Sequence, residues 1–164
     1  MVYYDEISGG YDELHRDEQL RKAMIIAEQI RPKQDELLLD VGCGPAPYFS
    51  MFGCERVGID PSIGLLRLAA GKEEGAFIQA QAEALPFTDK SFDYVISVTA
   101  VHNFKDVKKG LSEIRRVARG KVVLSVLRRS PKFEMIEGLI EELFKVEKII
   151  LEDKDAVFVA EPKR

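Results

Sequence analysis

The stretch Leu37-Leu38-Leu39-Asp40-Val41-Gly42-Cys43-Gly44-Pro45-Ala46-Pro47 decides how this chain folds. An apolar run that ends in an acidic residue and a glycine turn is typical of a buried parallel strand followed by a loop. Val57-Gly58-Ile59-Asp60, further along the chain, ends in a second carboxylate. Ligands of open α/β sheets bind beyond the carboxyl ends of the strands. Asp40 and Asp60 are therefore both predicted to lie at a ligand site.

The glycine turn indicates which ligand the site holds. Gly42 and Gly44 permit a sharp turn and a close approach of the backbone to the ligand, and Asp60 is placed to accept hydrogen bonds from ribose hydroxyls. A nicotinamide dinucleotide site requires Gly-x-Gly-x-x-Gly, but Pro47 stands at the third glycine position. Asp40 would also repel a pyrophosphate and attract a cation. These features favour S-adenosylmethionine, which carries a sulfonium and an ammonium group.

Four segments resemble, in order, the motifs of class I S-adenosylmethionine-dependent methyltransferases of the type 11, ubiquinone-biosynthesis-like branch. Leu39–Pro45 resembles the first motif, and Gly58–Ser62 resembles the acidic second motif. Gln81–Phe87 and Ser91–Ser97 are similar to the third and fourth motifs of that branch. Together they cover about residues 37–127. The resemblance implies an enzyme that transfers a methyl group from S-adenosylmethionine.

The resemblance also implies a set of cofactor-binding residues. Gly42 and Gly44 would line the methionine moiety, with Asp40 near its ammonium group directly or through water. Asp60 would hold the ribose hydroxyls, and the segment after residue 80 would meet the adenine. The whole set comprises Asp40, Gly42, Cys43, Gly44, Asp60, Pro61, Gln81, Ala82, Glu83 and Thr99.

Two positions depart from the family pattern. Ala46 stands where glycine is common, and Gln81 stands where an aspartate commonly meets the adenine amino group. A glutamine carbonyl can still accept a hydrogen bond from that amine. We therefore expect cofactor binding to survive.

Apolar periodicity predicts alternating helices and strands. A helix is expected over residues 12–30, with its inner face marked by Leu20, Met24, Ala27 and Ile30, and residues 1–11 are expected to form a flap ahead of it. After the first strand, further strands are expected at 55–60, 76–80, 94–98 and 122–127, with a closing hairpin at 145–151 and 156–160.

Local signals mark the other helices. Ser62 and Asp106 are predicted to cap the starts of two helices, and Gly120 is predicted to end the second of them. Ser130-Pro131 is expected to start a last helix that reaches Phe144.

These elements predict an α/β fold. We expect a Rossmann-like three-layer sandwich with a mostly parallel, seven-stranded sheet and an antiparallel C-terminal hairpin. One domain is expected over residues 1–164, comprising a flap and helix at 1–30, a cofactor-binding core at 37–127 and a C-terminal helix and hairpin at 131–164.

The acceptor side of the site is predicted from the residues just after the later strands. Methyl transfer from a sulfonium is an in-line displacement, so a general base is needed only if the acceptor must lose a proton. His102, just past the strand at 94–98, could act as that base. The alternative is that it only orients its loop through a backbone hydrogen bond. The candidate acceptor-binding residues are Tyr11, His102, Asn103, Arg128 and Arg129.

Two further groups of side chains carry alternative interpretations. Tyr3, Tyr4 and Tyr11 could close over the cofactor or could anchor the flap to the core. His15 is read as a solvated helix residue. Arg128 and Arg129 follow a strand and could receive a phosphate or carboxylate of the acceptor.

The charge distribution leaves the acceptor class open. Residues 105–132 hold ten basic and two acidic side chains, in a chain whose net charge is −4. A basic segment favours tRNA or rRNA as the acceptor, with or without a partner subunit, whereas Leu85-Pro86-Phe87 resembles a branch that favours small metabolites. A cofactor-binding subunit without catalysis is a further alternative. Pro47 disfavours a nicotinamide oxidoreductase.

Composition sets the remaining expectations. The chain has 164 residues, of which 46% are hydrophobic, and it shows neither a membrane span nor a signal peptide, so a cytoplasmic location is expected. Cys43 and Cys54 suggest neither a disulfide framework nor a metal site. A homodimer or a small partner subunit is possible. The single asparagine, Asn103, with abundant Glu and Lys, favours a heat-adapted source.

Overall fold

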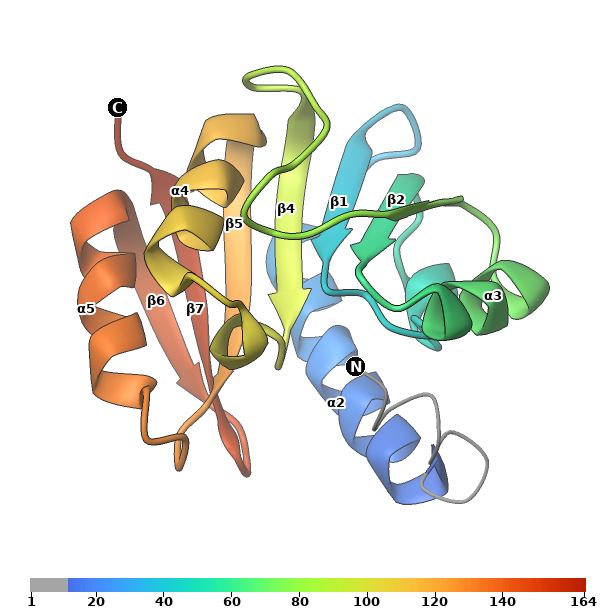
Figure 1. Cartoon of the computed structure of the whole chain (residues 1–164), viewed down its shortest axis with the longest axis horizontal. Helices are drawn as coiled ribbons and strands as arrows, with labels where there is room; N and C mark the ends of the chain where they lie inside the picture. Colours follow the sequence, from blue (N-terminus) through green and yellow to red (C-terminus); the bar gives the residue numbers. More distant parts are fainter. Residues whose placement is uncertain (1–11) are drawn as a thin grey trace.

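The structure is a computed structural model that describes residues 12–164 (Figure 1). One seven-stranded sheet runs through these residues in the order β3-β2-β1-β4-β5-β7-β6. The pairs among β1 to β5 are parallel, whereas β7 runs antiparallel to both β5 and β6. The predicted mixed sheet with an antiparallel hairpin is thereby confirmed. The strands are β1 (Leu37–Val41), β2 (Glu55–Asp60), β3 (Ala76–Gln79), β4 (Phe92–Val98), β5 (Ala118–Leu127), β6 (Phe144–Leu151) and β7 (Asp155–Pro162).

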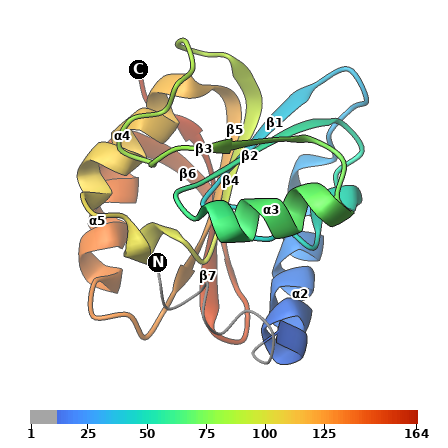
Figure 2. The ribbon, with the colours of Figure 1, turned by 45° about the vertical axis from the view of Figure 1, so that its right-hand side comes forward.

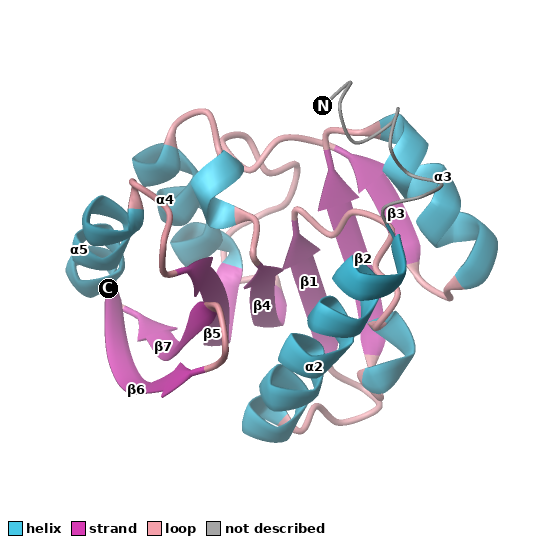
Figure 3. Ribbon diagram, turned by 90° about the horizontal axis from the view of Figure 1, so that it is seen from below, coloured by secondary structure: helices cyan, strands magenta, loops and turns pink. Residues whose placement is uncertain are grey.

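Helices cover both faces of the sheet (Figures 2 and 3). They are α2 (Asp12–Ile30), α3 (Ile63–Lys72), α4 (Val107–Val117) and α5 (Phe133–Leu143), with short 3₁₀-helices at Phe49–Met51 and Val101–Asn103. One core cluster joins the sheet to α4 and α5, through residues such as Leu111 and Ile140. A second cluster includes Ile26 of α2 and Leu66 of α3. The result is the predicted three-layer arrangement, because each face of the sheet is buried beneath helices.

The strand register brings three strand ends to one place. Asp40 of β1 pairs with Gly58 of β2 on one side and with Ile96 of β4 on the other. Because the three strands are parallel, the loops that come after them open at the same edge of the sheet. The glycine turn after β1 therefore lies between the end of β2 and the end of β4.

Both predicted helix caps are present. The Ser62 hydroxyl accepts a hydrogen bond from the backbone N–H of Leu65, and the Asp106 carboxylate accepts one from that of Lys109. These bonds satisfy amides that have no partner inside the helix. They fix where α3 and α4 begin.

The inner face of α2 differs from the prediction. Met24, expected to face inward, is 54% exposed, while Ala23 and Ile26 are fully buried. Two polar residues, Gln19 and Lys22, continue this buried face. The apolar stripe is therefore rotated by about one residue from the one predicted.

Several predicted boundaries are also corrected. Gly120 does not end a helix, because α4 ends at Val117 and Gly120 lies within β5. A Cβ atom at Gly120 would collide with the carbonyl oxygen of Asp93, so the close approach of β4 and β5 requires glycine there. The last helix begins at Phe133, and Phe144 is the first residue of β6 instead of a helix residue. The predicted flap at residues 1–11 lies outside the described residues.

None of the helices within residues 12–164 combines the length and the apolar character needed to cross a bilayer.

Candidate active site

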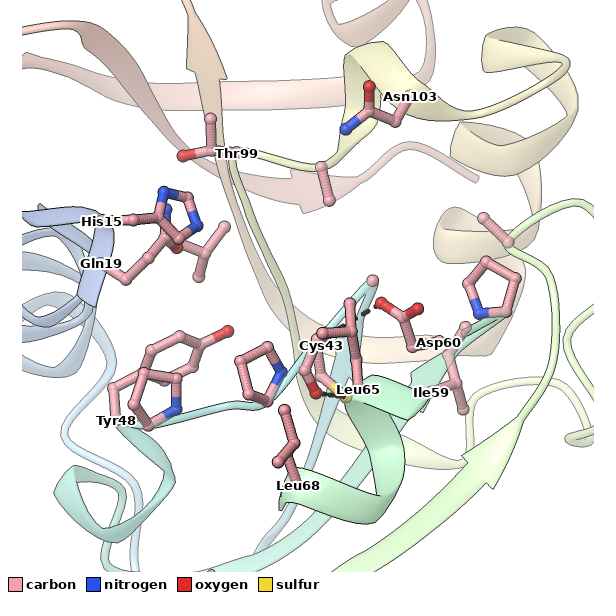
Figure 4. A pocket seen from close by; sticks show the side chains of 18 of the residues that line it. His15, Gln19, Cys43, Tyr48, Ile59, Asp60, Leu65, Leu68, Thr99 and Asn103 are labelled. Atoms are coloured by element: carbon pink, nitrogen blue, oxygen red, sulfur yellow. Dashed lines mark hydrogen bonds between the residues drawn. The ribbon is translucent and has the colours of Figure 1, made fainter. Parts of the chain in front are cut away.

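A cavity of about 890 Å³ opens beyond the carboxyl ends of β1, β2 and β4 (Figure 4). Its volume lies within the usual range for ligand pockets, about 300–1,000 Å³. Five segments form its wall: α2, the glycine turn, α3, the loop after β3 and the loop after β4. Its lining includes His15, Arg16, Gln19, Gly42, Cys43, Gly44, Tyr48, Asp60, Pro61, Gln81, Ala82, Glu83, Thr99 and Asn103.

The glycine turn forms the floor of this pocket. Gly42 has a φ angle of +77°, and its backbone N–H and that of Cys43 both donate to the Ile59 carbonyl at 2.9 Å. A Cβ atom on Gly42 would come within 2.7 Å of the Ala100 Cβ atom. The turn therefore needs glycine both for its dihedral angles and for the approach of the loop after β4.

Asp60 is held beside the turn with its carboxylate at the pocket. One oxygen accepts a hydrogen bond from the Gly44 N–H at 2.9 Å, and the other accepts one from the Ser62 N–H at 2.9 Å. Asp60 is thus oriented by the backbone, with its carboxylate in the pocket lining.

Asp40 lies behind the pocket wall. Its side chain is fully buried, and one oxygen accepts a hydrogen bond from the Tyr48 hydroxyl at 2.5 Å. The pKa of Asp40 is raised to about 7, chiefly by burial; the Tyr48 hydrogen bond lowers it, and the charge of Asp60 raises it. Tyr48 lines the pocket and Asp40 does not, so the Tyr48 side chain stands between the Asp40 carboxylate and the cavity.

The loop after β3 supplies the wall near Asp60. Gln81 is exposed, Ala82 is buried, and both line the pocket together with Glu83. The Glu83 carboxylate also accepts a hydrogen bond from the Asp106 N–H at 2.9 Å. This bond ties the loop to the start of α4.

Thr99 is the centre of a buried polar network at the end of β4. Its φ angle is +50°, a left-handed conformation that is rare for a β-branched residue. Its backbone N–H donates to the Ser125 carbonyl at 3.0 Å and to the Ser125 hydroxyl at 2.9 Å. Its own hydroxyl donates to an Asp155 carboxylate oxygen at 2.6 Å and accepts from Lys22 Nζ at 2.9 Å.

Lys22 and Asp155 complete this network as a buried ion pair. The Lys22 Nζ atom lies 3.2 Å from the Asp155 carboxylate, and the side chains are only 3% and 0% exposed. The sequence interpretation identified Thr99 but missed Lys22, Ser125 and Asp155. Nothing in the predicted apolar stripe of α2 marked Lys22 for burial.

His102 and Asn103 occupy different positions in the loop after β4. Asn103 lines the pocket, whereas His102 does not. The His102 Nδ1 atom is buried without a hydrogen-bond partner among residues 12–164. Burial lowers the pKa of His102, Lys132 and Lys22 lower it as well, and Asp155 opposes them. The position outside the lining argues against a general base, and Nδ1 does not make the backbone hydrogen bond that the loop-orienting interpretation requires.

The two predicted acceptor arginines are not brought to the pocket. The Arg128 guanidinium donates to the carbonyls of Glu152 at 3.1 Å and Asp153 at 2.6 Å, which ties it to the turn between β6 and β7. Neither Arg128 nor Arg129 lines the cavity. Tyr11 lies outside the described residues.

Three α2 residues reach the pocket in their place: His15, Arg16 and Gln19. His15, predicted to be solvated, is half-buried in the wall, and Gln19 is 7% exposed. The sequence offered little signal for them, because the surface that a helical polar residue covers depends on the packing angle of the helix. The described residues contain no cluster of side chains suited to a metal ion.

Comparisons with known proteins agree with this geometry. The methyltransferase domain family matches residues 39–126. The uncharacterized protein MJ1252 of Methanocaldococcus jannaschii is 34% identical over 119 residues, which cover 71% of this chain and 46% of that protein. The demethylmenaquinone methyltransferase of Thermotoga maritima is 32% identical over 143 residues, which cover 80% of this chain and 62% of that enzyme. The chain thus spans about half to two-thirds of the length of these curated relatives.

The fold is also found in a solved structure. A Haloferax volcanii methyltransferase, in complex with the Trm112 methyltransferase activator, superposes with a TM-score of 0.82 at 16% identity. The match covers 98% of each chain. At this identity the likeness shows a shared fold.

Proposed function

The chain belongs to the class I S-adenosylmethionine-dependent methyltransferases, and from this premise we propose that it transfers a methyl group to a small-molecule acceptor. The observation that supports this most is the pocket in which the glycine turn, Asp60 and Ala82 meet beyond the strand ends. The cofactor supplies an electrophilic methyl group on a sulfonium. The protein then has to bind the donor, hold the acceptor in line with it and exclude water.

The residues of the pocket fit an adenosine-based cofactor. Asp60, oriented by two backbone amides, is proposed to accept hydrogen bonds from the ribose hydroxyls. Gly42 and Gly44 leave space for the ligand to approach the backbone, and Cys43 and Pro61 complete this part of the wall. The adenine is proposed to lie against the loop after β3, with Gln81, Ala82 and Glu83 around it.

The loop after β4 is proposed to form the transfer side of the site. Thr99 is fixed there by Ser125 and Asp155, and Asn103 lines the pocket a few residues later. Asn103 carries both donors and an acceptor, so it can orient a neutral polar acceptor without changing its charge.

The partners of the basic segment favour a small acceptor over RNA. Arg116 pairs with Asp89 and Glu113, and Arg119 pairs with Asp93. Two of the lysines pair with carboxylates as well, Lys108 with Glu142 and Lys121 with Glu147. These carboxylates lower the positive potential that a nucleic acid would require. The relative from Thermotoga maritima, named as acting on demethylmenaquinone, agrees with a small acceptor.

A partner-dependent enzyme is the second candidate. The likeness to a methyltransferase that binds the Trm112 activator supports it. So do exposed apolar side chains near the β3 edge of the sheet, at Ile63, Leu68 and Ile78. Under this alternative the isolated chain binds the cofactor weakly, and its affinity rises when the partner is added.

Calorimetry with S-adenosylhomocysteine tests the cofactor site. We expect saturable binding to the isolated wild-type chain, no binding of NADH, and at least tenfold weaker binding of S-adenosylhomocysteine to Asp60→Asn. Asp89→Asn is the matched control, because Asp89 is exposed and pairs with Arg116 away from the pocket. A wild-type chain that binds no S-adenosylhomocysteine, with or without a partner, would refute the proposal.

Transfer from methyl-labelled cofactor then tests the acceptor class. Pools of small quinols, carboxylic acids and amines are compared with total RNA as acceptors. We expect label in the small-molecule fraction. Label found only in RNA would favour the nucleic-acid alternative, and binding without any transfer would favour a non-catalytic subunit.

A further inference from the structure

Gln19 presents its side-chain amide to the pocket. The residue is 7% exposed and lines the cavity from α2 (Figure 4). Within residues 12–164 the amide makes no hydrogen bond, and its atoms are not enclosed by protein as the unpaired Asp40 Oδ1 and His102 Nδ1 atoms are. The amide is therefore accessible from the cavity, and its donors and its acceptor are available to a polar group on a ligand.

The backbone that carries Gln19 is held firmly in place. Lys22 lies three residues further along α2, on the same side of the helix, and pairs with Asp155 at 3.2 Å and with Thr99 at 2.9 Å. Ala23 is fully buried beside it. The helix is therefore tied to the end of β4 and the start of β7, so the backbone that carries Gln19 does not have to be ordered when a ligand binds.

The position of Gln19 in the pocket indicates which part of the cofactor it meets. Figure 4 shows His15, Gln19 and Tyr48 on one side of the cavity and Asp60 on the other, with the glycine turn between them. If Asp60 binds the ribose, the ligand extends over Cys43 towards α2. The part of S-adenosylmethionine beyond the ribose is its amino-acid end, which carries one carboxylate and one ammonium group.

We propose that Gln19 binds the amino-acid end of the cofactor. An amide suits this zwitterion, because its NH₂ group can donate to the carboxylate and its carbonyl can accept from the ammonium. Tyr48 faces the same end, and its hydroxyl is already engaged by Asp40 at 2.5 Å. The assignment rests on the proposed function, since it requires an adenosine group at Asp60.

Two ligands that differ only in the amino-acid end test this proposal. S-adenosylhomocysteine carries that end, whereas 5′-methylthioadenosine replaces it with a methyl group. We compare their dissociation constants for the wild type and for Gln19→Met, which keeps the length of the side chain and removes its polar atoms. We expect affinity for S-adenosylhomocysteine to fall about tenfold, as for a lost hydrogen bond to a charged group, and affinity for 5′-methylthioadenosine to stay within twofold.

The outcomes separate this proposal from the proposed function. Gln29→Met is the matched control, because Gln29 lies on the same helix, outside the pocket lining, and accepts a hydrogen bond from Lys148. The assignment would be overturned if Gln19→Met bound S-adenosylhomocysteine as tightly as the wild type, or if it lost equal affinity for both ligands. In either case, binding of S-adenosylhomocysteine to the wild type would still support the cofactor site. A wild type that binds neither ligand would refute the proposed function itself.

Discussion

Asp40 is fully buried, its Oδ1 atom has no hydrogen-bond partner among residues 12–164, and its pKa is raised to about 7 from an ordinary value of 3.8. Between these two values the folded state holds a proton that the unfolded state has lost. The contribution of Asp40 to stability is therefore full below about pH 4, falls as the pH rises and is lost above about pH 7. The whole change is about 4 kcal/mol at 1.36 kcal/mol per pKa unit.

Asp40→Asn removes this titration and keeps an acceptor for the Tyr48 hydroxyl. We compare the free energy of unfolding of the variant with that of the wild type. The variant's value minus the wild-type value is expected to be larger at pH 8 than at pH 5. Urea denaturation of both proteins at the two pH values measures this difference. Other titrating groups cancel in the comparison, so parallel pH profiles would contradict the expected protonation of Asp40.

His102→Ala tests whether His102 acts as a general base. Because its side chain lies outside the pocket lining, we expect His102→Ala to lower turnover by less than tenfold and to leave the dissociation constant of S-adenosylhomocysteine unchanged. A positioned general base contributes about a hundredfold or more to the rate. A loss of that size, with normal cofactor binding, would restore His102 as the base. Turnover is measured with the acceptor identified by the labelling experiment.

The sequence predicts those site residues whose positions depend only on their neighbours along the chain. Gly42 and Asp60 are readable because a strand, a turn and a carboxylate come one after another along the chain. Gln19 and Asp155 are not readable in this way, since each reaches the site or its supporting network only through the packing of distant elements. The prediction that Arg128 reaches the acceptor is wrong for the same reason. Its guanidinium donates hydrogen bonds to the turn between β6 and β7, which lies at least 24 residues away in sequence.

At the scale of the element, helix starts are predicted better than helix faces. Ser62 and Asp106 cap α3 and α4 as expected, because a cap depends only on the next three residues. The inner face of α2 is misassigned, because Met24 was expected to face inward and is exposed, whereas Gln19 and Lys22 are buried. The end of α4 is also wrong, because pairing of Ala118 with Phe92 of β4 draws the following residues into β5.

A substitution at Gly120 tests whether this residue lies in β5, as the structure shows, or ends α4. A Cβ atom there would strike the Asp93 carbonyl, so we expect Gly120→Ala to lower the free energy of unfolding by about 1–3 kcal/mol through overpacking. Gly138→Ala is the matched control, because Gly138 lies inside α5 and a Cβ atom added there would have no neighbour within 4 Å. We expect it to raise stability by up to about 1 kcal/mol, as alanine favours helices over glycine. Equal effects of both variants in thermal denaturation would contradict the strand assignment.

At the scale of the whole molecule, the Lys22–Asp155 ion pair joins the first described helix to the last strand of the chain. Removing one partner leaves a buried charge without compensation, so we expect Lys22→Met to cost about 3–5 kcal/mol of unfolding free energy. The double variant Lys22→Met/Asp155→Asn removes both charges and keeps an acceptor for the Thr99 hydroxyl. We expect it to recover at least half of that loss. Independent, additive losses in urea denaturation would show that the two side chains do not interact.

The overall fold was predictable because it repeats one local unit, a strand followed by a helix. Alternation of strands and helices predicts a parallel sheet, and the polar turn at Glu152-Asp153-Lys154-Asp155 predicts the closing hairpin, although Asp155 proves to be the first residue of β7. The sequence did not reveal how α2 is fixed to the sheet, because this depends on a pair of residues more than a hundred positions apart.

The position of β7 between β5 and β6 has a consequence for how the protein is made. Lys22 is synthesised long before its partner Asp155, which follows β6. Burying the lysine without its partner would leave an unpaired charge. We therefore expect α2, the first described helix, to reach its final position during translation only after β7 has inserted.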